Sequence, residues 1–188
     1  MKEILDLLCL IHPLSAECLA FLKSVAERQE VKKGAFLLKP GHVNDRLFFI
    51  KKGLLRCYYL KNDRELTDWF FWEMDAVVSI DSFYDQVPSK DFIQAIEDTE
   101  VFWISAKDLE KAYDTYPEFN YVGRVLTTKY LRIWHRLARR IRYLRTEERY
   151  RLVVAEQPEI FLRVPLNVLA TYFDMSPETL SRLRGQEN

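Results

Sequence analysis

The chain has 188 residues, of which 48% are apolar, 14% aromatic and 30% charged, so it can bury a sizeable core and is too apolar to be disordered. No apolar run approaches the ~20 residues that span a bilayer, and three widely spaced cysteines indicate a reducing cytoplasm rather than a disulfide framework. The net charge is zero, but residues 1–118 hold 15 basic and 21 acidic residues, whereas residues 119–188 hold 13 and 7. This asymmetry indicates two parts with different partners.

Several functional classes find no support in the sequence. Glu3 and Asp6 interrupt the apolar N-terminus, which also lacks the basic start and small-residue cleavage site of a signal peptide. The cysteines and histidines are not grouped as metal ligands are, so no metal site is expected. There is no phosphate-binding loop and no set of nucleophile, base and orienting group, so the protein is not expected to be an enzyme.

The first two thirds of the chain begin with a helix and continue as strands. Ser15 can cap a helix that runs to about Glu27. From Val31 to Ile104, short runs rich in β-branched and aromatic residues alternate with turns, which predicts a small antiparallel sandwich or barrel. The strand candidates are Ala35–Leu38, Arg46–Lys51, Leu54–Leu60, Leu66–Trp72, Phe92–Glu97 and Val101–Ile104.

Two helices are predicted next, and the second is unusually long. Ser105 caps the first, which ends near Tyr116. From Glu118 to about Leu144 there is no proline, and apolar residues recur every three or four positions over about 40 Å of helix. These apolar residues are Val122, Leu126, Tyr130, Ile133, Leu137, Ile141 and Leu144. The face they form is interpreted either as core packing on the sandwich or as the seam of a homodimer.

The C-terminal segment from Arg163 to Arg184 predicts two short helices with a tight break between them. Pro165 suits the first turn of a helix that ends near Tyr172, and Ser176 is a strong N-cap for a second helix over Pro177–Arg184. This spacing is typical of a helix-turn-helix, and the alternative is an ordinary helical hairpin with a solvated face. The outward residues of the second helix are Ser176, Pro177, Glu178, Ser181, Arg182 and Arg184, which suit a major groove.

Three segments together resemble the cyclic-AMP receptor protein/FNR (Crp/Fnr) family of bacterial transcription regulators. They are VKKGAFLLKPGHVNDRLFFIKKGLLRCYY, the hinge-like sequence TEER from Thr146, and QPEIFLRVPLNVLATYFDMSPETLSRLR. The resemblance implies an α+β fold, with a cyclic-nucleotide-binding-type jelly roll and flanking helices over residues 1–117. A long dimerisation helix over residues 118–145 and a winged helix-turn-helix over residues 146–188 would follow.

The resemblance also implies roles for residues of the last helix. Glu178 and Arg182 stand where the family reads bases, and Ser176, Thr179 and Ser181 stand where it contacts phosphate or sugar. Pro177 replaces a basic residue of some members, and any wing must precede the helix-turn-helix, with Ile160–Val164 as the candidate. The implied partners are double-stranded DNA, a second copy of the chain through the long helix, and RNA polymerase.

The ligand pocket departs from the family pattern. Ile80 stands where nucleotide-binding members have a ribose-binding Glu, Lys90 where they have a phosphate-binding Arg, and Asp91 where they have a hydroxyl. Isoleucine cannot accept a hydrogen bond, and the Asp91 carboxylate would repel a phosphate. The other expected pocket residues are Ser79, Ser89, Tyr130, Ile133 and Trp134. Cyclic AMP is therefore not expected as a cofactor, which leaves another small-molecule effector or a filled, unused pocket.

Two functions follow from the sequence. The first is a dimeric, cytoplasmic, sequence-specific DNA-binding transcription regulator that does not respond to cyclic AMP. The alternative is a small-molecule sensor or protein-interaction module whose helix-turn-helix does not bind DNA. The segment 163–184 contains only three arginines, Arg163, Arg182 and Arg184, opposed by Asp174 and Glu178, so modest non-specific DNA affinity is expected.

Overall fold

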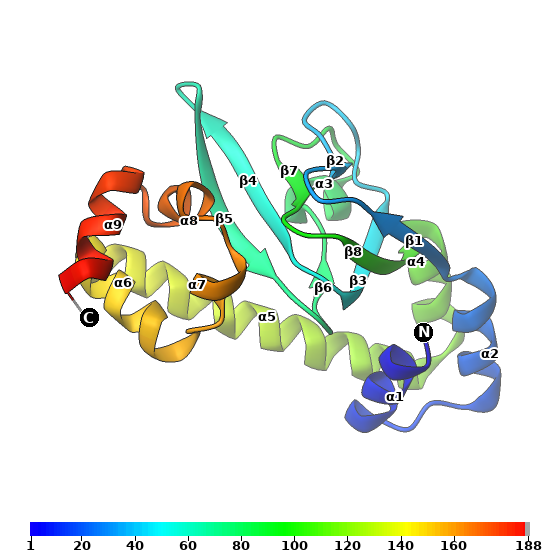
Figure 1. The fold of residues 1–188 in the computed structure, drawn as a ribbon. Coiled ribbons are helices and arrows are strands. Elements are labelled where there is room, and N and C mark those ends of the chain that lie inside the picture. The colour runs from blue at the N-terminus through cyan, green and yellow to red at the C-terminus, as the bar shows by residue number, and fades with distance from the viewer. Residues whose placement is uncertain (187–188) are drawn as a thin grey trace. The chain divides into compact units, whose positions relative to one another are not determined.

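The strands of the computed structural model, which describes residues 1–186, form two four-stranded sheets (Figure 1). One sheet has the strand order β1-β8-β3-β6 and the other β2-β7-β4-β5. The strands are β1 (Glu27–Val31), β2 (Phe36–Leu38), β3 (Arg46–Lys52), β4 (Leu55–Lys61), β5 (Arg64–Phe71), β6 (Ala76–Val77), β7 (Phe92–Ala95) and β8 (Thr99–Ser105). The pairs β1–β8, β3–β8, β3–β6 and β2–β7 are antiparallel, so the predicted antiparallel jelly-roll class is confirmed.

Helices precede and follow the sheets along the chain. They are α1 (Lys2–Ile11), α2 (Ala16–Val25), α3 (Ile80–Asp85), α4 (Ala106–Thr115), α5 (Pro117–Tyr143), α6 (Thr146–Glu156), α7 (Ile160–Arg163), α8 (Leu166–Phe173) and α9 (Pro177–Gln186). The long helix was predicted within one residue at each end. The helix predicted to reach Glu27 instead ends at Val25, because β1 begins at Glu27 and pairs with β8. In the described part of the chain, no helix is both long and apolar enough to cross a membrane.

The chain divides into two compact units. The first comprises residues 1–57 and 70–129, and the second comprises residues 58–69 and 130 onward. The long helix α5 and the hairpin of β4 and β5 therefore each contribute to both units. The predicted division into three domains, with boundaries at residues 117 and 145, stays a prediction.

The core of the first unit joins its N-terminal helices to α4 and to the start of α5. Leu5, Leu22, Ala112 and Val122, one from each of these helices, are buried in one apolar cluster. The Ser15 hydroxyl donates a hydrogen bond to the Glu118 carboxylate at 2.6 Å, which fixes the start of α2 against the start of α5 and lowers the pKa of that carboxyl. Apolar burial and this polar contact thus hold the first two turns of the long helix.

Gly123 allows α4 and α5 to approach closely. A Cβ atom at this position would lie 2.6 Å from the Tyr113 ring of α4. Burial raises the pKa of Tyr113 to about 12, and its ring lies 5.2 Å from that of Phe119. The glycine therefore serves helix packing, although it lowers the intrinsic helix propensity of α5.

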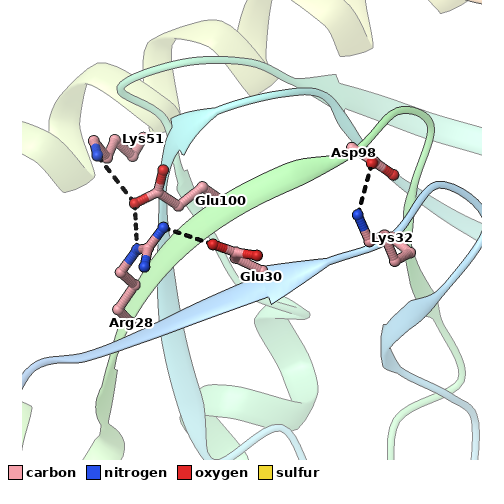
Figure 2. Close-up of polar contacts among 6 residues, drawn as sticks. All are labelled: Arg28, Glu30, Lys32, Lys51, Asp98 and Glu100. Carbon is pink, nitrogen blue, oxygen red and sulfur yellow. Dashed lines mark hydrogen bonds and ion pairs between the residues drawn. The ribbon is translucent and has the colours of Figure 1, made fainter.

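Ion pairs connect neighbouring strands of the first sheet. The Glu100 carboxylate of β8 accepts hydrogen bonds from Arg28 Nε of β1 at 2.6 Å and from Lys51 Nζ of β3 at 3.0 Å (Figure 2). Arg28 also contacts Glu30, and Lys32 pairs with Asp98 at 3.0 Å. The hydrogen bond from Arg28 is the main cause of a lowered pKa at Glu100. Cross-strand charge pairing of this kind stabilises the β1–β8–β3 order.

Replacing Glu100 with glutamine should lower the melting temperature near neutral pH and should have no effect in acid. Because the fold lowers the pKa of Glu100, its stabilising contribution is complete above the ordinary carboxyl pKa and is lost as the pH falls through the lowered value. Melting curves of parent and Glu100→Gln protein from about pH 7 to about pH 3 test this. Glu30→Gln, which removes only one contact to Arg28, is the control. A melting difference that is constant with pH would contradict the assignment.

The second unit is built from helices α6 to α9, the C-terminal half of α5 and the end of the β4–β5 hairpin. The hairpin contacts α8 through a hydrogen bond of 2.7 Å between the Thr67 and Thr171 hydroxyls and through an ion pair of 3.6 Å between Arg64 and Asp174. The prediction of a wing within Ile160–Val164 is wrong. This segment is helix α7, because Ile160 and Val164 lie one turn apart and both bury their side chains, and residues 146–186 contain no strand.

Candidate functional site

Helices α8 and α9 form a helix-turn-helix, drawn in orange and red in Figure 1. Asp174 ends α8 in the left-handed conformation with φ of 52°, and its N–H donates to the carbonyl of Ala170. The N–H of Met175 donates to the same carbonyl at 3.1 Å. Asp is one of the few residues other than Gly that tolerate this conformation, so three residues suffice to connect the helices.

A buried core fixes the two helices relative to each other. Leu169, Ala170 and Phe173 of α8 and Leu180 of α9 are each no more than 1% exposed. The Phe173 ring also meets the ring of Tyr150 of α6 at 5.7 Å. Burial of these four apolar side chains therefore holds α9 against α8 and leaves the opposite face of α9 accessible to solvent.

The opposite face of α9 is polar. Ser176 caps the helix, its hydroxyl accepting a hydrogen bond from the N–H of Thr179 at 3.2 Å. All the residues predicted to contact DNA lie at this cap or on this helix. Ser176, Glu178, Ser181, Arg182 and Arg184 are exposed, and Pro177 and Thr179 are half-buried. The structure therefore groups these residues on one accessible surface, while their contacts with DNA stay a prediction.

The charges at the start of α9 suit recognition of base edges. A hydrogen bond from Ser176 is the main cause of a lowered pKa at Glu178, which keeps this side chain an acceptor near neutral pH. Arg182 lies one turn further along and approaches the Thr179 hydroxyl at 3.4 Å. This long contact leaves the guanidinium able to form the paired hydrogen bonds that guanine accepts.

Helix α6 connects the long helix to the helix-turn-helix. The N–H of Arg145 donates to the Glu148 carboxylate at 2.7 Å at the start of α6, which is the hinge-like segment singled out in the sequence. Arg140 of α5 pairs with Glu156 at the end of α6, also at 2.7 Å. The first contact caps α6, and the second connects the end of α6 to α5.

The predicted pocket residues of the first unit form a hydrogen-bonded cluster. Ser79 is 2% exposed and donates from its hydroxyl to the Asp91 carboxylate at 2.6 Å. The Ser79 and Ser89 hydroxyls lie 3.1 Å apart, and the N–H of Asp91 donates to Ser89 at 2.9 Å. The polar groups expected to receive a ligand are therefore hydrogen-bonded to one another, with a carboxylate at their centre.

The remaining predicted pocket residues are not part of this cluster. Ile80 is 49% exposed at the start of α3, and the Lys90 side chain is exposed. Tyr130, Ile133 and Trp134 lie on the part of α5 that belongs to the second unit, where the Trp134 ring lies 5.8 Å from that of Trp69.

Asn44 belongs to the same cluster, and the sequence analysis missed it. Its Oδ1 accepts from the N–H of Ser79 at 2.7 Å, and its own N–H donates to the Ser82 hydroxyl at 2.8 Å. Asn44 is 2% exposed. It lies more than 30 residues from its partners in the chain, and no local sequence pattern reveals such a contact.

Comparisons with known proteins agree with this architecture. Residues 28–116 match the cyclic nucleotide-binding domain family. The c-di-GMP responsive global regulator CLP of Xanthomonas campestris is 20% identical, with a TM-score of 0.72 over 92% of this chain and 91% of that chain. A Crp/Fnr-family putative transcriptional regulator of Eubacterium rectale is 22% identical, with a TM-score of 0.69 over 90% and 82%. The catabolite activator protein of Thermus thermophilus is 19% identical, with a TM-score of 0.58 over 94% and 85%.

No curated protein gives a significant sequence match. At identities of 22% or below, the solved structures identify the fold, and the domain match identifies the first unit independently. Residues 28–116 are therefore similar to a cyclic nucleotide-binding domain, and the chain has the fold seen in Crp/Fnr regulators.

Proposed function

We propose that this protein is a dimeric, sequence-specific DNA-binding regulator of transcription. The observation that carries the proposal is the accessible polar face of α9, held by a fully buried apolar face on α8. A helix of this kind fits the major groove, and the similar solved structures include transcriptional regulators.

Most residues of the α9 surface have a proposed role. Arg182 would donate a pair of hydrogen bonds to guanine, and Glu178 would accept one from the amino group of cytosine. Ser176, Thr179 and Ser181 would contact phosphate or sugar and so set the position of the helix. Pro177 offers no donor, so recognition depends mainly on the two charged residues.

Dimerisation through α5 would place two copies of α9 on one DNA duplex. Ile141 is 57% exposed and Leu131 67% exposed on this helix, so apolar surface is available for a second copy. Two copies of α9 related by a two-fold axis would enter successive major grooves about 34 Å apart. The protein would act in the cytoplasm, where cysteines such as Cys9, Cys18 and Cys57 stay reduced. RNA polymerase remains an expected partner from the family resemblance.

We further propose that cyclic AMP is not the effector. The Asp91 carboxylate occupies the cluster of Ser79 and Ser89 and would repel an approaching phosphate. Ile80 offers no acceptor for a ribose hydroxyl, and Lys90 lacks the planar fork that binds phosphate in two places.

Calorimetric titration of the full chain with cyclic AMP should give a dissociation constant weaker than about 1 mM. The matched variant combines Ile80→Glu, Lys90→Arg and Asp91→Ser, and it should bind more tightly than the parent because it restores an acceptor, a fork and a hydroxyl. Micromolar binding of cyclic AMP by the parent would contradict the prediction.

A salt titration separates the proposed regulator from a module that does not bind DNA. DNA affinity of the regulator should fall steeply with salt, with a log–log slope of about −0.9 for each phosphate contact. A charge-reducing variant of the α9 surface, Arg182→Ala with Arg184→Ala, should bind more weakly with a shallower slope. Absence of measurable DNA binding by the parent at about 50 mM salt would favour the sensor or protein-interaction module.

A further inference from the structure

The second unit contains a cavity of about 180 Å³. Its walls come from the middle of β5, the C-terminal half of α5, α6 and α8. The lining residues all belong to this one unit. They comprise Thr67, Asp68, Trp134, Leu137, Ala138, Arg140, Ile141, Arg149, Val153, Tyr172 and Phe173. A ligand here would contact both the long helix and the first helix of the helix-turn-helix.

The size and walls of the cavity favour a single aromatic ring. A protein cavity of about 150 Å³ with apolar walls is large enough to admit benzene. Three of the wall residues are aromatic, namely Trp134, Tyr172 and Phe173. The Trp69 ring packs against two of them, with its centroid 5.8 Å from that of Trp134 and 6.4 Å from that of Tyr172. Such rings favour an aromatic ligand through offset or edge-to-face contacts.

One side chain of the cavity wall points to a negatively charged ligand. Arg149 lines the cavity, and its Nη2 donates a hydrogen bond to the Thr146 hydroxyl at 3.2 Å. A carboxylate in the cavity would form a charge-assisted hydrogen bond with this guanidinium. Arg140 adds a second positive charge, which Glu156 partly offsets, and Asp68 is the one carboxylate among the described residues that line the cavity.

We propose that this cavity binds a small aromatic carboxylate with one ring. The ring would lie among Trp134, Tyr172 and Phe173, and the carboxylate would pair with the Arg149 guanidinium. Because the ligand would connect α5, α6 and α8, it would stabilise the second unit and adjust the helix-turn-helix. Binding itself requires no DNA, so it can be tested separately from the proposed regulatory function.

A second copy of the chain is the competing occupant of this surface. Leu137 and Ile141 line the cavity and also belong to the apolar face predicted for the dimer. A partner α5 would cover apolar side chains, but residues 119–146 contain no Asp or Glu, so this helix would bring no carboxylate to Arg149. This difference favours a small anion, and it makes oligomeric state a necessary readout of the test.

Benzoate is the first probe. Calorimetry on the full chain should show one benzoate bound per chain with a dissociation constant below about 1 mM, and tryptophan fluorescence should change because Trp134 lines the site. Benzyl alcohol tests the need for the charge, and cyclohexanecarboxylate tests the need for the aromatic ring. Each should bind at least about tenfold more weakly than benzoate. Equal binding of all three would overturn the proposed ligand class.

Two variants locate the site, with a third as control. Arg149→Met should weaken benzoate binding by about tenfold or more, whereas Arg136→Met, on an exposed residue of α5 that does not line the cavity, should leave it unchanged. Ala138→Phe should abolish binding without disturbing the fold, because Ala138 is exposed at the cavity wall. Ala138→Phe therefore tests the site even if Arg149→Met fails to fold.

Sedimentation of the same proteins distinguishes the competing occupant. The proposal predicts that Ala138→Phe loses benzoate binding and keeps the oligomeric state of the parent. If the parent does not bind benzoate and Ala138→Phe changes only the monomer–dimer equilibrium, the cavity belongs to the interface between copies and the proposal is wrong. Unchanged benzoate affinity in both Arg149→Met and Ala138→Phe would also overturn it.

Discussion

Replacing Arg182 with alanine is expected to weaken binding to the specific DNA site by about 1–3 kcal/mol, roughly 5- to 150-fold. Arg182 is exposed on α9, and the contact between its guanidinium and the Thr179 hydroxyl is long, at 3.4 Å. Its guanidinium can therefore turn to guanine without losing a strong hydrogen bond. Fluorescence anisotropy with the specific duplex and with single-base variants of that duplex measures both affinity and base preference.

The loss of affinity, compared between the specific duplex and unrelated duplexes, shows whether Arg182 contacts a base or only phosphate. Arg182→Ala should bind the specific duplex more weakly and should no longer distinguish the base pair that Arg182 reads. Its affinity for unrelated duplexes should change far less. If all duplexes are weakened by the same factor, Arg182 contacts only phosphate and the base-reading role is wrong.

Replacing Phe173 with alanine should destabilise the second unit by about 3–5 kcal/mol. Phe173 is 1% exposed, and its ring lies within 6.4 Å of the rings of Tyr150 and Phe161 from the preceding helices. The substitution leaves a cavity where α6, α7 and α8 meet. A loss of this size is a large share of the stability of a small domain, so DNA binding should also be lost.

Hydrogen exchange of the α8 and α9 amides, together with denaturant unfolding, measures this effect. Leu162→Ala is the matched control, because Leu162 is 85% exposed and its truncation should change stability by no more than about 0.5 kcal/mol. Protection of α8 and α9 that is equal in Phe173→Ala and in the parent would show that Phe173 does not hold the helix-turn-helix together.

Elements with a strong local signal were predicted well from the sequence. An apolar repeat of three and four residues predicts the long helix. The Ser-Pro-Glu sequence before Leu180 predicts the start of α9. Six strands appear within two residues of their predicted ends. In each case, the residues that determine the element lie within the element itself.

Elements that depend on distant partners were missed. The five residues of β1 are mostly charged and exposed, so they carry little strand signal and are extended because they pair with β8. Helix α1 contains Ile4, Leu5 and Leu8 on one face, but its apolar character was interpreted only as evidence about a leader sequence. The wing was expected at Ile160–Val164 from its place in the chain, whereas the spacing of its two buried residues indicates a helical turn.

The candidate sites also differ in whether their residues are close together in the sequence or far apart. The surface of α9 could be predicted because its members lie within nine residues of one another. The Ser79 and Asp91 cluster could be predicted only as a departure from a family pattern, and its closure by Asn44 depends on a loop far away in the sequence. The cavity beside Arg149 joins four elements and could not be predicted from any one of them.

Selection of binding sites from random duplexes tests the central claim most directly. The purified full chain is used for several rounds of selection, and the enriched duplexes are sequenced. If the protein binds DNA as a dimer through its two copies of α9, the enriched sites will be two-fold symmetric, with half-site centres about 10–10.5 base pairs apart. Enrichment of no sequence above the starting pool would contradict the proposal that α9 reads DNA.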